Sequence, residues 1–234
     1  MNPSGISAPV SCEAPEKPDL SGLVRPGMVW CLDTLDALDA PLHPAEKPGT
    51  ERMAPVRLRE YIAGRTAARR ALRELRGHSH AAVLRNEDRT PAWPPGVCGS
   101  ISHSRHYAIC VVARLDNYRA VGVDIEEDSR LKETLWKSVM TGKEQAFLSN
   151  LPSQLGQLAA TLRFSVKEAY YKCLCGLPGK PGSMLEPPHI ETAIDDIAGT
   201  FHGAVPTCPE LPMISGCFTH FDRHWIALCQ LPKS

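Results

Sequence analysis

The stretch VGVDIEED, residues 121–128, places two carboxylates in a run that otherwise has the pattern of a β-strand. Alternate residues of a strand point to opposite faces. The apolar residues at 121, 123 and 125 therefore share one face, and Asp124 and Glu126 share the other face with Gly122. Two such acids lie roughly 7 Å apart along the backbone, twice the strand rise. Like charges this close raise each other's pKa unless a positive group intervenes.

Two interpretations of this acidic pair are open. A divalent cation would remove the repulsion, and ligands that are all oxygen atoms favour magnesium or calcium over zinc. The other interpretation is a strand edge with two solvated acids, because Asp-x-Glu is a common pattern.

A second stretch, RFSVKEAYYK at residues 163–172, has helical character. Glu168 and Lys172 are four residues apart and share a helix face. Such a pair is usually a surface salt bridge that contributes little. The apolar and aromatic residues around it indicate a covered helix, where the acid could be a third metal ligand and the lysine could bind a phosphate.

The amino-acid composition limits the classes of protein to which the chain can belong. The chain has 234 residues, with 26 basic and 26 acidic side chains. This balance gives no support for a broad nucleic-acid or anionic-membrane surface. Nine cysteines, none with zinc-finger spacing, favour reduced thiols in a cytoplasmic protein. The polar, Pro-rich first twenty residues lack signal-peptide character, and no apolar run reaches the length of a membrane span.

Helical and strand-like patterns alternate along the chain. Apolar spacing predicts a helix over 54–76 that ends at Gly77. Strands are predicted at 107–115 and 120–126, joined by a turn into a hairpin.

The C-terminal part repeats this alternation. Thr141 and Glu144 have capping-box spacing, and a longer helix is predicted over 153–175. A terminal hairpin is predicted from strands at 214–221 and 224–231. The class is therefore α+β, with two similar hairpin-plus-helix halves. We expect an irregular, Pro-rich region at 1–50, an N-terminal half at 51–119 and a C-terminal half at 120–234.

Three motifs together resemble a known family. GVDIE, followed about forty residues later by FSVKEAYYK, is similar to two signature motifs of the phosphopantetheinyl transferases of the surfactin-synthetase-activating type. The upstream stretch RTPAWPPGVCGSISHS resembles that family's first motif and is closest to the branch that contains enterobactin synthetase component D. The resemblance covers about residues 65–172. It implies a pseudo-dimeric fold within one chain, and hence a monomer.

The resemblance also implies a reaction. The family transfers 4′-phosphopantetheine from coenzyme A, as co-substrate, to a serine of an apo acyl or peptidyl carrier protein and releases adenosine 3′,5′-bisphosphate. It implies that Asp124, Glu126 and Glu168 hold Mg²⁺. Lys172 would bind the phosphates as a point charge, so Asp124, Glu168 and Lys172 are the expected catalytic residues. Either Glu168 or a water held at the metal would accept the serine proton.

Coenzyme A contacts follow from the same resemblance. His103 would bind a coenzyme A phosphate, with Ser102 nearby and Lys172 on the pyrophosphate. The candidates for the nucleotide end are basic residues of GRTAARRAL and DRTP, namely Arg65, Arg69 and Arg89. Arg65 and Arg69 share a helix face, where either an anion lies between them or their heads extend into water.

Two other functions compete with this one. A magnesium-dependent phosphohydrolase or nuclease could use the same acids and lysine, and a non-catalytic carrier-binding scaffold could keep the fold. The carrier served, in siderophore, other nonribosomal peptide, polyketide or fatty acid synthesis, is not specified by these residues. The enterobactin resemblance favours siderophore or other nonribosomal pathways by analogy.

Overall fold

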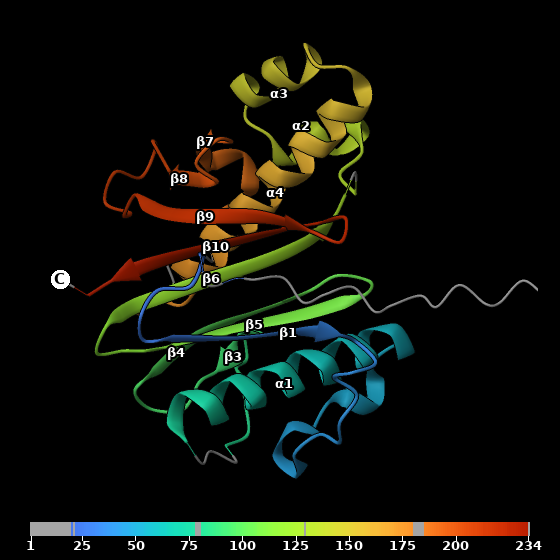
Figure 1. The fold of residues 1–234 in the computed structure, drawn as a ribbon, viewed down its shortest axis with the longest axis vertical. Coiled ribbons are helices and arrows are strands. Elements are labelled where there is room, and N and C mark those ends of the chain that lie inside the picture. Colours follow the sequence, from blue (N-terminus) through green and yellow to red (C-terminus); the bar gives the residue numbers. More distant parts are fainter. Residues whose placement is uncertain (1–19, 21, 78–80, 129, 180–184, 234) are drawn as a thin grey trace, which may run out of the picture.

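The first half of the chain forms a three-stranded antiparallel sheet covered by one long helix. In the computed structural model, which describes residues 20, 22–77, 81–128, 130–179 and 185–233, the strand order is β1-β5-β4. Helix α1 packs on one face through small residues such as Ala68, which lets it lie close to the sheet (Figure 1). The bounds are β1 (Met28–Thr34), α1 (Pro55–Arg76), β4 (Val97–His103) and β5 (Tyr107–Arg114).

The second half forms a five-stranded antiparallel sheet with its own long helix. The strand order is β6-β10-β9-β8-β7, and α4 lies across β6 and β10. The bounds are β6 (Tyr118–Glu127), α2 (Trp136–Val139), α3 (Gly142–Ser149), α4 (Ser153–Cys175), β7 (Glu191–Asp195), β8 (Thr200–Ala204), β9 (Ile214–Phe221) and β10 (His224–Pro232). Shorter elements are η1 (Pro44–Glu46), η2 (Thr50–Arg52), β2 (Leu84–Arg85), β3 (Pro91–Ala92), η3 (Glu133–Leu135) and η5 (Pro187–His189).

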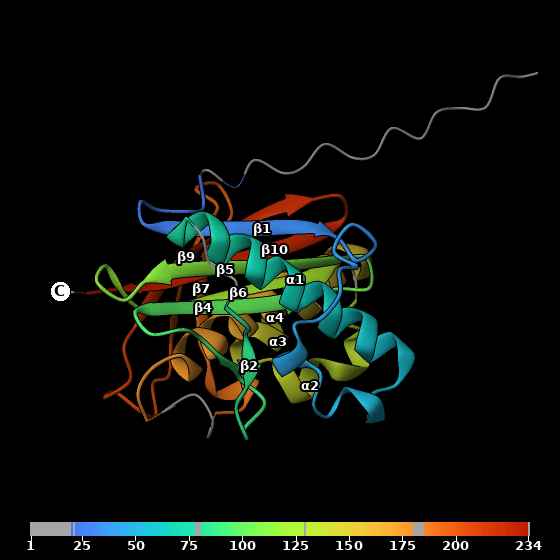
Figure 2. The same ribbon diagram turned by 90° about the horizontal axis from the view of Figure 1, so that it is seen from below.

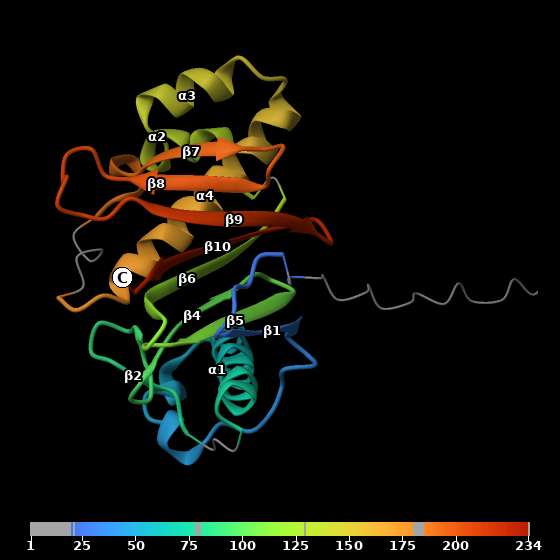
Figure 3. The same ribbon diagram turned by 60° about the vertical axis from the view of Figure 1, so that its left-hand side comes forward.

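The two sheets pack face to face between the two helices. Ile109 and Val111 of β5 meet Val123 and Ile125 of β6 in one buried cluster. The alternate residues of β5 face α1 instead. Figures 2 and 3 show the resulting layers, with α1 and α4 on opposite outer sides. Each half therefore has a long helix that precedes an antiparallel strand pair, β4–β5 or β9–β10, as predicted for an α+β fold of two similar halves.

The predicted hairpin between residues 107–115 and 120–126 is wrong. β5 is the central strand of its sheet and pairs with both β1 and β4. β6 belongs to the other sheet and pairs with β10. Both edges of β5 are thus occupied, so the turn after Arg114 carries the chain from one sheet to the other. The partner β1 lies in the region at 1–50 that was expected to be irregular, and residues 1–19 and 21 of that region fall outside the described residues.

The other predicted elements are confirmed closely. Thr141 and Glu144 form a reciprocal capping box at the start of α3. The terminal hairpin turns at Asp222 and Arg223, whose φ angles of 40° and 58° fit a two-residue type I′ turn. Within the described residues, no helix is both long and apolar enough to cross a membrane.

Buried cysteines behave as small apolar residues. Cys98, Cys110, Cys173 and Cys229 are free thiols in the core, as expected for a chain without a disulfide framework. Burial raises the pKa of Cys98 to about 12, so this thiol stays protonated at neutral pH.

Candidate active site

The acidic face of β6 lies directly under α4. The apolar residues at 121, 123 and 125 point into the core between the sheets, so the predicted alternation is confirmed. Gly122 sits where the helix comes closest: a Cβ added there would lie 2.0 Å from the Ala169 carbonyl oxygen. Only glycine permits this approach. The close contact brings Glu168 and Lys172 of α4 over Asp124 and Glu126 of β6.

Asp124 is the most buried of the acids, at 2% exposure. Its Oδ1 atom accepts hydrogen bonds from Lys172 Nζ at 2.6 Å and from Ser102 Oγ at 2.8 Å. Lys172 Nζ also donates to Ser102 Oγ at 2.9 Å. The other oxygen, Asp124 Oδ2, is buried and has no hydrogen-bond partner. A buried carboxylate oxygen without a partner is costly, which indicates a place for a further positive group.

Glu126 and Glu168 are destabilised as anions. Burial, followed by the nearby Asp124, raises the pKa of Glu126 to about 8 even though Arg130 lies 3.0 Å away. Burial also raises the pKa of Glu168, against the opposing effect of Lys172. For Lys172, burial favours the neutral amine, but Asp124 and Glu168 outweigh it and raise its pKa. The site therefore has more negative charge than one lysine and one arginine compensate.

These residues fit a hard divalent cation in their chemistry. The candidate ligands Asp124, Glu126 and Glu168 offer only carboxylate oxygens, and they line one cavity of about 400 Å³, hereafter the charged pocket. Within the described ranges no three Asp, Glu, His or Cys side chains are already gathered closely enough to hold a metal ion. Instead, the Lys172 ammonium group forms an ion pair with Asp124 Oδ1. The donor set fits magnesium, although it is not assembled into a ligand cage.

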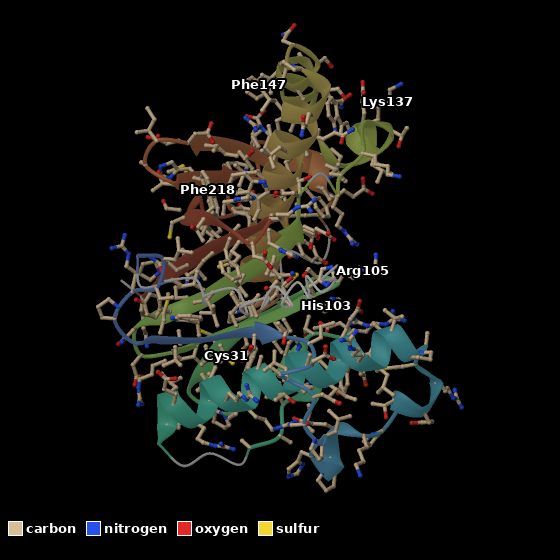
Figure 4. All side chains as sticks on the ribbon, turned by 45° about the vertical axis from the view of Figure 1, so that its right-hand side comes forward. Cys31, His103, Arg105, Lys137, Phe147 and Phe218 are labelled. Carbon is tan, nitrogen blue, oxygen red and sulfur yellow. The ribbon has the colours of Figure 1, made fainter. Side chains whose placement is uncertain are left out.

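His103 ends β4 on the opposite wall of the charged pocket. Its Nε2 atom lies 2.5 Å from Arg57 Nη1 and 3.6 Å from Glu60 Oε2. Burial is the largest effect on His103 and lowers its pKa; Glu60 raises it and Arg57 lowers it. Figure 4 places His103 and the neighbouring Arg105 between α1 and the C-terminal half. Arg57 and Glu60 were not predicted, although Arg57 lies about two helical turns before Arg65 on the same face.

The three predicted arginines have different surroundings. Arg65 is 5% exposed, stacks over the Tyr61 ring at 4.6 Å and lines the charged pocket, where its buried Nε has no hydrogen-bond partner. Arg89 also lines this pocket and holds a left-handed φ of 71°. Arg69 turns away, because it is paired with the buried carboxylate of Glu46. The structure therefore does not place an anion site between Arg65 and Arg69.

A larger cavity of about 810 Å³, hereafter the apolar pocket, adjoins the charged pocket. The two share Arg89, Pro91, Ile101 and Lys172. Trp93 lies over β4, where a Cβ on Gly99 would come within 2.7 Å of its ring. The pair of pockets suits a molecule with a phosphate-rich end and a long, weakly polar arm.

Comparisons with known proteins agree with this chemistry. Residues 45–113 match the family described as 4'-phosphopantetheinyl transferase N-terminal domain, and residues 120–229 match the 4'-phosphopantetheinyl transferase superfamily. The chain is 34% identical over 193 residues to 4'-phosphopantetheinyl transferase Npt of Nocardia iowensis, covering 80% of this chain and 85% of that protein. It is 38% identical over 127 residues to enterobactin synthase component D of Salmonella typhi, covering 53% and 50% of the two chains.

A crystal structure of Thermotoga maritima holo-[acyl-carrier-protein] synthase is also similar in part. It superposes with a TM-score of 0.38 at 22% sequence identity, over 50% of this chain and 65% of that one.

Proposed function

The chain belongs to the 4′-phosphopantetheinyl transferase superfamily, and on that basis we propose how its two pockets transfer phosphopantetheine from coenzyme A to a carrier protein. The acceptor is a serine hydroxyl of an apo acyl or peptidyl carrier, and the second product is adenosine 3′,5′-bisphosphate. The observation that supports this most directly is the meeting of Asp124, Glu168 and Lys172 where the charged pocket joins the apolar pocket.

In this proposal the pyrophosphate of coenzyme A lies in the charged pocket. Lys172 Nζ is 2.9 Å from Ser102 Oγ, so a phosphate oxygen reaching Ser102 would also reach the ammonium group. His103, Arg57 and Arg65 are on the α1 side of the same pocket, where they would bind the phosphates of the nucleotide end. Arg89 lines both pockets and would contact the ligand at their junction. We leave Arg69 out of the site, since Glu46 already neutralises it.

Asp124, Glu126 and Glu168 would hold the magnesium ion. When bound, the ion neutralises charge on the pyrophosphate as its bridging bond breaks. Burial and the nearby Asp124 raise the pKa of Glu126, and the positive charge of the ion would oppose both effects.

Glu168 is our choice for the group that accepts the serine proton. It lines the charged pocket, and a carboxylate that gives one oxygen to the ion keeps a second oxygen that can accept the proton. Lys172 follows one helical turn later and would stay positively charged, because its pKa is raised. It can therefore bind the leaving phosphate throughout the reaction.

The apolar pocket favours transfer over simple phosphodiester hydrolysis. A hydrolase needs a phosphate site and a water, whereas a wall that includes Trp93, Tyr171 and Leu177 suits the pantetheine arm. The finer family type, the surfactin-synthetase-activating type near the enterobactin branch, is supported by the motif wording and by the 38% identity to enterobactin synthase component D of Salmonella typhi over about half of each chain. The carrier belongs to siderophore, nonribosomal peptide, polyketide or fatty acid synthesis, and we leave this choice open. We expect the protein to be a cytoplasmic monomer.

The test is mass spectrometry of an apo carrier protein incubated with the enzyme, coenzyme A and Mg²⁺. The expected result is a mass gain of one phosphopantetheine on the carrier serine. Asp124→Ala should retain less than about a tenth of the wild-type rate, because a hard-ion site loses affinity and geometry with each ligand. If a series of peptidyl and acyl carriers gains no mass while coenzyme A is hydrolysed, the hydrolase function replaces this one.

A further inference from the structure

The buried carboxylate of Glu46 takes no part in the transfer chemistry described above. Glu46 is 2% exposed and lines neither the charged pocket nor the apolar pocket. Its Oε2 atom forms an ion pair with Arg69 of α1 and accepts a hydrogen bond from His43 N at 3.0 Å. Its Oε1 atom accepts a hydrogen bond from Val83 N at 2.9 Å. One side chain therefore joins η1, α1 and the segment that leads into β2.

Val83 is the last residue before the hairpin of β2 and β3. It is fully buried in the apolar cluster beneath α1. The next residue, Leu84, pairs with Ala92 of β3, and its carbonyl oxygen accepts a hydrogen bond from Arg65 Nη2 at 3.4 Å. The first strand of the hairpin is thus held against α1 through Glu46 and Arg65.

The turn of this hairpin carries Arg89. Asn86 N donates to the Thr90 carbonyl oxygen and Arg89 N donates to the Asn86 carbonyl oxygen, both at 2.9 Å. Asp88 Oδ1 accepts hydrogen bonds from Thr90 N at 3.0 Å and from Thr90 Oγ1 at 2.6 Å. Within this closed turn Arg89 has a left-handed φ of 71°, which a residue with a side chain adopts only where the surrounding structure imposes it. A displacement of β2 would therefore displace Arg89 with it.

We propose that Glu46 is a positioning residue for coenzyme A binding. It fixes the hairpin of β2 and β3 so that Arg89 reaches the junction of the charged pocket and the apolar pocket. This role rests on the proposed function, in which Arg89 contacts coenzyme A at that junction. Pro91 of the same hairpin lines both pockets, so the hairpin forms part of the wall of each. Glu46 itself touches no ligand and acts through Arg89.

The arrangement requires a carboxylate at position 46. A carboxylate only accepts hydrogen bonds, and here both of its oxygens do so. In Glu46→Gln the amide has one accepting oxygen and one donating NH2 group. The oxygen would face the charged Arg69, because charge-assisted hydrogen bonds are the stronger ones. The NH2 group would then meet Val83 N–H, donor against donor, and the start of β2 would move away.

The test is a double-mutant cycle on the dissociation constant of coenzyme A, measured by calorimetry on the full chain at constant Mg²⁺ and ionic strength. We expect Arg89→Gln to weaken binding by about tenfold, through the loss of one charge-assisted contact. Glu46→Gln should weaken it by about threefold to tenfold. The variant with both changes should bind about as weakly as Arg89→Gln alone, because Glu46 acts through Arg89. Independent effects would add instead.

Glu144→Gln is the matched control from the C-terminal half. Glu144 is also buried, at 7% exposure, is also paired with a cation, Lys167, and lines neither pocket. Any loss of affinity that this variant causes should add to the loss in Arg89→Gln. If Glu46→Gln does not fold, Glu46→Leu combined with Arg69→Met takes its place in the cycle with the same expected result. This pair removes the acceptor for Val83 N and replaces the buried ion pair with apolar side chains.

Losses that add in the cycle overturn the inference, and so does wild-type affinity for coenzyme A in either Glu46→Gln or Arg89→Gln. The readout is binding and does not depend on transfer. The expected coupling, found in a protein that binds coenzyme A but adds no mass to any apo carrier, would support the role of Glu46 and contradict the proposed function.

Discussion

At the residue scale, the acidic residues of the candidate site were predictable from the sequence, and its basic residues were less so. Asp124 and Glu126 share a face because of the period of two in a strand, which sequence shows directly. The ion pair between Arg69 and Glu46 was not predictable. Glu46 lies 23 residues earlier, in a short 3₁₀ helix with no strong sequence pattern. Arg57 and Glu60 were not predicted, because they lie in the first turns of α1, before the resemblance to the family begins near residue 65.

Lys172 should matter mainly for turnover. Its ammonium group lies at the junction of the two pockets, where the proposed mechanism places the negative charge that grows on the leaving phosphate. We expect Lys172→Ala to lower kcat by at least about a hundredfold with a smaller change in KM, as measured by steady-state kinetics. A raised KM with unchanged kcat would show that Lys172 binds substrate and transition state equally.

Glu60 should limit how far the pKa of His103 falls. Its carboxylate is 3.6 Å from His103 Nε2 and opposes both burial and Arg57, which lower the pKa of His103. Glu60→Gln should therefore lower that pKa further, as followed by NMR titration, and weaken coenzyme A binding by roughly five- to tenfold. Glu74→Gln, at an exposed position of α1, is the control. An unchanged His103 titration would contradict the assigned role.

At the element scale, single elements were predicted better than their pairing. α1 and α4 were found within a residue of their ends, because long apolar periodicity and the flanking glycines mark them. The pairing of β5 with β1 joins residues about 80 positions apart, and no local pattern records it. The apolar run in β5 also hides which face meets α1, since both faces are covered.

The contact between α4 and β6 should be intolerant of one added methyl group. In Gly122→Ala the new Cβ would meet the Ala169 carbonyl oxygen at 2.0 Å, so the helix must move away from the strand. We expect a loss of about 3 kcal/mol in the free energy of unfolding, measured with urea, together with most of the activity. Gly142→Ala at the start of α3 has no atom within 4 Å of the new Cβ and should be close to wild type. Similar losses in both variants would refute this account.

At the scale of the whole molecule, the crowded acids should make stability depend on pH. Burial and Asp124 raise the pKa of Glu126 to about 8, from 4.5 as the ordinary value. Between these two values the folded protein keeps a proton that the unfolded chain releases, so the free energy of unfolding falls as pH rises. The contribution is fully present below pH 4.5 and is lost as the pH passes 8.

In a chelating buffer, stability should fall between pH 5 and 8 by on the order of 2 kcal/mol more in wild type than in Glu126→Gln. Adding Mg²⁺ at pH 8 should stabilise the wild type and affect the variant less. Thermal denaturation over this pH range measures both effects, with the exposed Glu133→Gln as control. Parallel pH profiles for wild type and Glu126→Gln would remove Glu126 from the acidic cluster.

The contact between the two sheets also has a consequence for how substitutions on its two sides are inherited. Ser102 and Asp124 bond across it at 2.8 Å, and Tyr107 donates to Asp222 at 2.6 Å, so each pair joins one half of the chain to the other. In a protein assembled from separately encoded subunits, the residues on the two sides of such a contact can change independently. Here both members of every such pair are encoded in one gene and copied together. A substitution on one side therefore always meets the same opposite side, and a compensating change can spread with it.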